Sequence, residues 1–242
     1  MITILSVFPE LLDLNGDAQN ALVLAQRARW AGWDARVHNL ALGDSLEGEA
    51  PQAVIVGSGA ESSAPRVLEG LRALEGSLRA WSADGIPLLA VGTGWELLSG
   101  SVELSSGDAL EGLGIFSGHS VARARVSDDL VVDSDFGRLI GFENHAREYR
   151  AVAGARALGT VVYGVGNSLA AEPRLEGEVV GTSIGTHLHG PVLAKNPGLA
   201  DYLLGLITDG RYEANNATAE RVDASAQAAR NQIAVRLGLA AE

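Results

Sequence analysis

The chain has 242 residues, a net charge of −12, a hydrophobic fraction of 47% and no cysteine. This length suits one α/β domain, alone or with an appendage, and the hydrophobic fraction is sufficient for a buried core. The absence of cysteine excludes disulfides and thiolate metal sites, and the acidic balance argues against a nucleic-acid partner. No apolar segment is long enough to span a bilayer, and the start lacks the basic region of a signal peptide, so we expect no membrane insertion and a cytoplasmic location.

Short apolar runs alternate with helical patterns over the first hundred residues. Such alternation predicts βαβ units, and therefore a parallel sheet covered by helices on both faces, with ligands outside the carboxyl ends of the strands. The expected strands are 2–8, 35–40, 52–57 and 88–91, and the expected helices are 17–31, 64–83 and 95–98.

The middle of the chain, from about residue 113 to 185, changes character. Short strand-like runs (VARARV, DLVVD, RLIGFE, TVVYGVG, VVGTSIG) are separated by glycines, which predicts an antiparallel or mixed extension of the sheet. Pro197 suits the first turn of a helix that runs towards Asp209. The alanine-rich tail from Asn215 predicts a terminal helix that packs on its own domain, with docking on a partner as the alternative. We therefore divide the chain into a domain at 1–210 and a helical appendage at 211–242.

The stretch PLLAVGTGWELLSG, residues 87–100, reads as a strand, a tight turn and a helix, which is how many hydrolases and transferases present a nucleophile. The apex of such an elbow has a positive φ and needs small residues two positions before and after it. Thr93 would have bulky residues at both positions, whereas Gly92 has Ala90 and Gly94. The pattern places the apex at Gly92, which adopts the conformation easily but has no side chain to react. An ordinary strand-to-helix turn is the alternative.

Two histidines, His187 and His189, lie two residues apart in GTHLHGP and share a face if the segment is extended. One could serve the elbow as a general base, since catalytic histidines are often distant in sequence from the nucleophile. They could instead begin a metal site, which is disfavoured because no third ligand is evident, or be hydrogen-bonded histidines near a strand end. VGSGAES lacks the third glycine of a dinucleotide fingerprint. We expect no cofactor and no metal.

Motifs along most of the chain are specific in combination, although each is weak alone: DLNGDAQN (13–20), VGSGAE (56–61), LEGLGI, RVSDDLVVDSD, GFENH (141–145), YGVGN and LHGPVLAKNP (188–197). Together they resemble the class I glutamine amidotransferases of the cobyric-acid-synthase-like type. More narrowly, the chain is similar to the GatD-type glutaminase subunits of lipid II isoglutaminyl synthase. The resemblance implies a three-layer α/β fold with a flavodoxin-like, mainly parallel sheet.

The resemblance also implies roles for particular residues. The family's elbow reads Cys-Gly-Gly-Tyr-Gln, and its cysteine, which attacks the side-chain amide of glutamine, falls on Gly92. The family's catalytic histidine falls on His189, an arginine that admits or holds glutamine on Arg125, and an oxyanion-hole amide on Ser58 and Gly59. The acidic third member of the triad is implied to come from the partner, a Mur-ligase-like ATP-dependent subunit that amidates the D-glutamate of the peptidoglycan stem peptide.

The elbow of this chain departs from the family pattern. Gly92 replaces the nucleophile, and Thr93, Trp95 and Glu96 replace Gly, Tyr and Gln, so an engineered change of one cysteine to glycine is disfavoured. Acyl transfer to a thiolate cannot occur without the sulfur. We expect a glutaminase-type subunit that does not hydrolyse glutamine, or alternatively a non-catalytic pseudo-amidotransferase that stabilises or regulates the Mur-ligase-like partner. The change Gly92→Cys is expected to bring a thiol within reach of His189.

Overall fold

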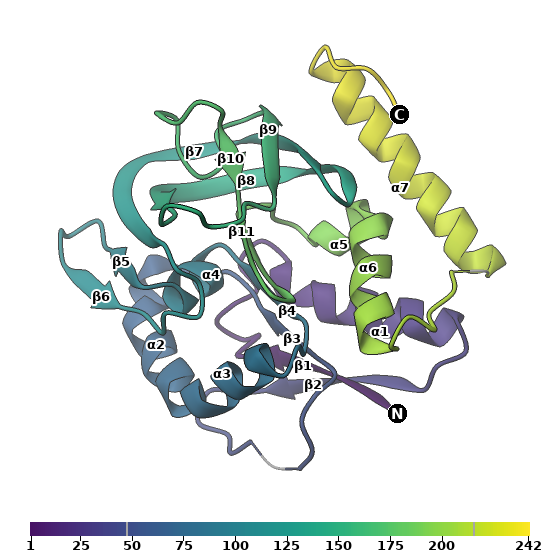
Figure 1. Cartoon of the computed structure of the whole chain (residues 1–242), viewed down its shortest axis with the longest axis horizontal. Coiled ribbons are helices and arrows are strands. Elements are labelled where there is room, and N and C mark those ends of the chain that lie inside the picture. The colour runs from purple at the N-terminus through teal and green to yellow at the C-terminus, as the bar shows by residue number, and fades with distance from the viewer. Residues whose placement is uncertain (47, 215) are drawn as a thin grey trace.

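The structure is a computed structural model that describes residues 1–46, 48–214 and 216–242. Two six-stranded sheets organise this part of the chain (Figure 1). The first sheet has the strand order β11-β12-β4-β3-β1-β2, in which all neighbours are parallel except β11 and β12. Its strands are β1 (Ile2–Val7), β2 (Ala35–Leu40), β3 (Ala53–Val56), β4 (Leu88–Val91), β11 (Glu178–Val180) and β12 (Ser183–Thr186).

Both faces of the first sheet are buried, as the sequence predicts. In β4, Leu89 and Val91 pack into one core with helices from residues 20–30 and 192–207, while Leu88 and Ala90 pack into a second core with helices from residues 64–98. Successive residues of a strand point to opposite faces, so an unbroken apolar run requires helices on both sides. The predicted α/β class with a helix–sheet–helix arrangement is confirmed.

The middle of the chain forms a second sheet, with the order β10-β9-β7-β5-β6 and with β8 paired to β7. Its strands are β5 (Ser101–Glu103), β6 (Ala109–Glu111), β7 (His119–Ser134), β8 (Gly137–Arg150), β9 (Gly159–Tyr163) and β10 (Leu175–Glu176). The sequence predicts these runs as an extension of one sheet, but only β11 and β12 extend it. The runs VARARV and DLVVD are one long strand, because β7 pairs with β8 along almost its full length through a bulge between Ala122 and Val126.

The helices are α1 (Asn20–Trp30), α2 (Ala64–Ala73), α3 (Glu75–Ala83), α4 (Thr93–Leu98), α5 (Val192–Lys195), α6 (Pro197–Ile207) and α7 (Ala217–Arg236), with short 3₁₀ turns at Asp17–Gln19 and Glu61–Ser63. The single helix predicted at 64–83 is divided at Leu74, whose amide bonds to the carbonyl of Leu71 in a tightened turn. Gly76, a poor helix former, follows the break. Pro197 occupies the first turn of α6, as predicted.

The terminal helix α7 lies along the side of the molecule (Figure 1). Its Ala234 is buried against Val131 of β7 and Ile140 of β8. Arg27 of α1 forms ion pairs with Asp201 of α6 at 2.6 Å and with Asp223 of α7 at 2.5 Å. These contacts support packing of the tail on its own chain, and the division into 1–210 and 211–242 stays a prediction. Asn215, in the tail segment, lies outside the described residues. Within the described ranges, no helix is long and apolar enough to cross a bilayer.

Candidate active site

The turn between β4 and α4 has the geometry of a nucleophile elbow. Gly92 has φ 51° and ψ −122°, which an L side chain rarely adopts. Its amide donates to the carbonyl of Thr186 at 2.9 Å, and its own carbonyl accepts from Glu96 N at 2.9 Å, which begins α4. A Cβ on Gly94 would lie 2.3 Å from the carbonyl oxygen of Gly57, so only glycine fits there. The backbone therefore has its apex at Gly92, where the steric argument from the sequence puts it.

His189 follows β12 and lies beside this apex. It is fully buried, and its Nδ1 lies 2.8 Å from Oδ2 of Asp17, while Asp17 Oδ1 accepts from Gly190 N at 3.0 Å. A proton on Nδ1 that is donated to Asp17 leaves Nε2 as the basic nitrogen. Nε2 is buried and has no hydrogen-bond partner among the described residues. A Cβ on Gly92 would lie 2.7 Å from His189 Cε1, so a side chain at this position would contact the imidazole.

The Asp17–His189 pair is a contact that the sequence does not predict. Asp17 Oδ2 of this chain lies 2.8 Å from His189 Nδ1, and the acidic residue that the resemblance implies from the partner subunit stays a prediction. Asp17 is itself fully buried, in the 3₁₀ turn that precedes α1. The motif DLNGDAQN contains the residue, so the signal is present in the sequence, but its role depends on a contact across 172 positions.

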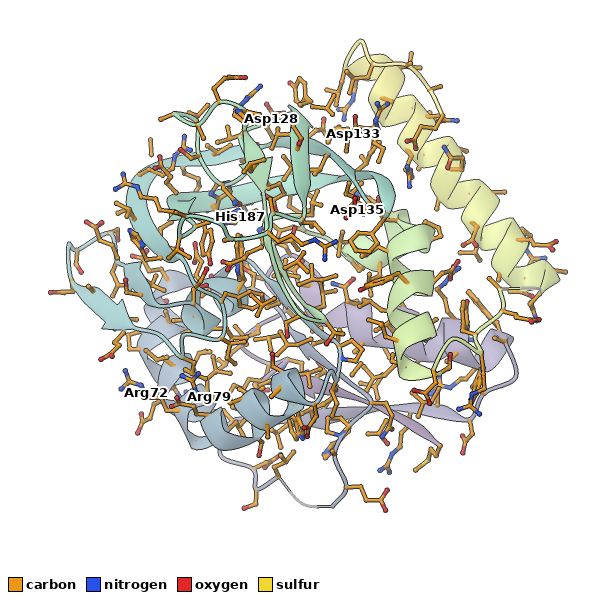
Figure 2. The ribbon with its side chains drawn as sticks, viewed as in Figure 1. Arg72, Arg79, Asp128, Asp133, Asp135 and His187 are labelled. Atoms are coloured by element: carbon orange, nitrogen blue, oxygen red, sulfur yellow. The ribbon has the colours of Figure 1, made fainter. Side chains whose placement is uncertain are left out.

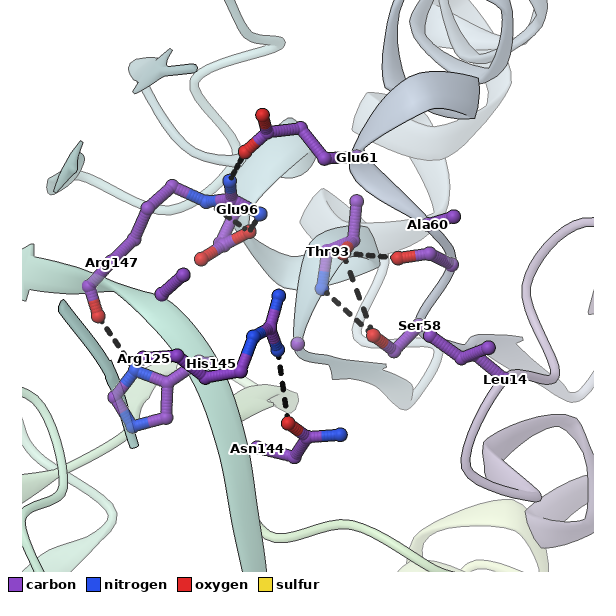
Figure 3. A pocket seen from close by; sticks show the side chains of 13 residues that line it. Leu14, Ser58, Ala60, Glu61, Thr93, Glu96, Arg125, Asn144, His145 and Arg147 are labelled. Carbon is purple, nitrogen blue, oxygen red and sulfur yellow. Dashed lines mark hydrogen bonds and ion pairs between the residues drawn. The ribbon is translucent and has the colours of Figure 1, made fainter. Parts of the chain in front are cut away.

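Ser58 and Gly59, which follow β3, also lie beside the apex. Ser58 Oγ accepts a hydrogen bond from Thr93 N at 3.3 Å, and the Thr93 hydroxyl donates to the carbonyl of Gly59 at 2.9 Å (Figure 3). At an elbow the amide after the apex commonly supports an oxyanion. In this chain, the Thr93 amide already has a partner in Ser58. The predicted site residues Gly92, His189, Ser58 and Gly59 are thus brought together.

A cavity of about 180 Å³ opens beside the elbow. Its lining includes Ser58, Gly59 and Gly92 together with Arg125 and Asn144 from the second sheet. Arg125 Nη1 donates to Asn144 Oδ1 at 2.9 Å, and its side chain points into the same space as Thr93 and Ser58 (Figure 3). Arg125 therefore lines the cavity beside the elbow, and its role in admitting or holding glutamine stays a prediction.

An ion-pair network that the sequence does not predict forms one wall of this cavity. Arg147 of β8 lies 2.7 Å from Glu96 of α4 and 2.5 Å from Glu61 (Figure 3). Burial alone would lower the pKa of the Arg147 guanidinium, but the two carboxylates outweigh burial and raise it. The Ser105 hydroxyl and Arg147 hold the pKa of Glu61 below its usual value. Glu96 replaces the glutamine of the family's elbow, and Arg147 neutralises it.

His187 has different surroundings from His189. It lies in the interior near the second sheet (Figure 2) and stacks on His145 with ring centroids 4.0 Å apart. Its Nδ1 is 3.5 Å from Glu176 Oε2, and burial together with His145 lowers its pKa, so the ring is neutral. Across the described ranges, no group of three or more His, Cys, Asp or Glu side chains could hold a metal ion.

A strand–turn–helix elbow at the carboxyl ends of a parallel sheet, faced by a buried His–Asp pair, defines an acyl-transfer type of site from which the nucleophile is missing. Residues 4–197 match the CobB/CobQ-like glutamine amidotransferase domain, and the chain belongs to that family. The family assignment, predicted from the motifs, is confirmed.

Relatives and solved structures agree with this assignment. The chain is 31% identical over 206 residues to the lipid II isoglutaminyl synthase (glutamine-hydrolyzing) subunit GatD of Staphylococcus aureus, covering 84% of this chain and 83% of that protein. It is 26% identical to the subunit of the same name from Streptococcus pneumoniae, covering 87% of this chain and 82% of that protein.

The fold also resembles solved glutamine amidotransferases. A crystal structure of a glutamine amidotransferase matches with a TM-score of 0.53 at 18% identity, covering 84% of this chain and 98% of that one. A glutamine amidotransferase from Thermotoga maritima matches with a TM-score of 0.52 at 15% identity, covering 93% of each chain. At these identities the similarity supports the fold alone.

Proposed function

We propose that this chain is the GatD-type subunit of a lipid II isoglutaminyl synthase and that it does not release ammonia from glutamine. The family and the two relatives named GatD support the first part. In that role the chain binds a Mur-ligase-like, ATP-dependent subunit, in the cytoplasm, and the complex amidates the D-glutamate of the peptidoglycan stem peptide with ammonia from another source.

The observation that carries the second part is the geometry at residue 92. The backbone at residue 92 has a φ of 51°, as the apex of an elbow requires, and a side chain at this position would contact His189, but the residue is glycine. The whole chain contains no cysteine, so no other thiol can take its place. His189 and Asp17 retain the arrangement of a general base and its orienting carboxylate, without a nucleophile to activate.

The second candidate is a non-catalytic scaffold or regulator of the same ligase. It is favoured by the hydrogen bond between Ser58 Oγ and the Thr93 amide, which leaves that amide unavailable to a reaction intermediate. The two candidates differ in whether the ligase needs this chain when ammonia is supplied.

The test is an amidation assay with the purified complex and a peptidoglycan precursor that carries unamidated D-glutamate. We expect ammonium chloride to support ATP-dependent amidation and glutamine to support none. The assay is then repeated with the ligase subunit alone. Loss of ammonia-dependent amidation supports a required subunit, whereas unchanged amidation supports a regulator. Glutamine-supported amidation above the background without a nitrogen source would contradict the proposal.

A further inference from the structure

Ser58 occupies the space that a side chain on residue 92 would need. A Cβ added to Gly92 would lie 2.7 Å from Ser58 Oγ and 3.0 Å from Ser58 Cβ. Rotation of the hydroxyl relieves the first contact but leaves the second, because the Cβ is fixed by the backbone. Ser58 is buried, and its backbone carbonyl accepts from Leu14 N at 3.0 Å, so the loop is not free to withdraw.

Ser58 also engages the amide that an elbow uses to stabilise negative charge. Thr93 is the residue after the apex, and its N–H donates to Ser58 Oγ at 3.3 Å. A reacting carbonyl oxygen would have to displace that hydroxyl before it could accept from the amide. The Thr93 hydroxyl is bonded to the Gly59 carbonyl, which ties the same two segments together a second time.

We infer that Ser58 blocks this site. Its side chain fills the space of a nucleophile on residue 92 and accepts from the Thr93 amide, which an elbow uses to bind an oxyanion. The loss of the nucleophile at residue 92 is therefore coupled to the presence of a serine side chain at residue 58. The inference rests on the proposed function in assuming that the elbow once carried a thiol. It changes the expectation for Gly92→Cys, because the new side chain collides with Ser58 unless Ser58 is also replaced.

The first experiment measures the coupling between residues 58 and 92 as a change in the Tm of the full chain. Four proteins are compared: wild type, Ser58→Gly, Gly92→Ala and the double variant. The strain of an L residue at φ 51° and the 2.7 Å contact with His189 are present in both proteins that carry the Gly92→Ala change, so they cancel in the comparison. We expect Ser58→Gly to raise the Tm of Gly92→Ala by about 3 °C or more while lowering that of the wild type.

The second measurement is thiol labelling, which is unambiguous because the wild-type chain has no cysteine. Gly92→Cys, Ser58→Ala/Gly92→Cys and Ser58→Gly/Gly92→Cys are treated with iodoacetamide and with 6-diazo-5-oxo-L-norleucine, a glutamine-like alkylator, and followed by intact mass. We expect the Ser58→Gly/Gly92→Cys protein to react with the diazoketone about tenfold faster or more than the single variant Gly92→Cys. The Ser58→Ala/Gly92→Cys protein, which frees the amide but keeps a Cβ at residue 58, falls between them.

Additive Tm changes in the four-protein comparison overturn the inference, and so does labelling of Gly92→Cys at the same rate with and without Ser58. If the cysteine variants do not fold, the Tm comparison decides alone. Neither measurement uses the ligase subunit. A failed amidation assay therefore leaves this result unaffected, and equal labelling rates leave the proposed function unaffected.

Discussion

Replacing Arg147 by methionine removes the partner of a buried carboxylate. Glu96 is 1% exposed, and its Oε2 accepts from Arg147 Nε at 2.8 Å and lies 2.7 Å from Nη2, while its Oε1 has no hydrogen-bond partner within the described part of the chain. Loss of one member of a buried ion pair leaves an uncompensated charge and costs about 3–5 kcal/mol. We expect Arg147→Met to lower the free energy of unfolding by that amount at pH 7.

Urea unfolding followed by circular dichroism measures the change, and Arg150→Met on the same strand is the matched control. Arg150 is 55% exposed and pairs with Glu148 at 2.9 Å. Because solvent screens an exposed pair, this control should lose only about 0–1 kcal/mol. Arg147→Lys, which retains the charge, should fall between the two. A loss at pH 7 no larger than that of Arg150→Met would refute this reasoning.

Three further predictions concern other contacts. Asp17→Asn weakens the hydrogen bond to His189 Nδ1 and should lower the free energy of unfolding by about 1–3 kcal/mol in urea titrations; an unchanged midpoint would show that the pair is not stabilising. Because the pKa of Glu61 is lowered, its stabilisation is present above the unfolded value, about 4.3, and is lost as the pH falls through the lower folded value. Glu61→Gln should therefore destabilise at pH 7, and its deficit relative to wild type should shrink as the pH falls below about 4.3. A deficit that is absent at pH 7, or one that grows at lower pH, would contradict this. A chain that ends at residue 210 removes the cover that Ala234 gives to the second sheet, so its Tm should fall; an unchanged Tm would mean that α7 is a separate appendage.

The central strands β1, β3 and β4 of the first sheet are predicted well by the sequence because each is a short, largely apolar run. β4, for example, lies between Pro87 and Gly92, and its bounds agree with the prediction. The strands of the second sheet are predicted as strand-like runs, but their separation from the first sheet is not, since the pairing of β7 with β8 and β9 depends on partners that local patterns do not specify. The long strand β7 reads as two short runs, VARARV and DLVVD, because the polar residues Ser127 and Asp128 lie between them.

For the candidate site, local sterics identify the apex at Gly92, and the resemblance identifies His189 and Arg125 as its neighbours. The sequence does not reveal Asp17 as the partner of His189, because the two residues are 172 positions apart. It also assigns Ser58 a role through its backbone, whereas in the structure the Ser58 side chain accepts from the Thr93 amide and lies where a Cβ on Gly92 would be. That difference arises from a contact between two loops, and no pattern within either loop contains it.

The central claim is that this elbow no longer hydrolyses glutamine, and release of glutamate tests it most directly. The purified chain, alone and with its ligase subunit, is incubated with glutamine, and glutamate is measured against a His189→Ala control. We predict no release above that control under either condition. Glutamate release that depends on His189 would contradict the account, because it would require a nucleophile that Gly92 cannot provide.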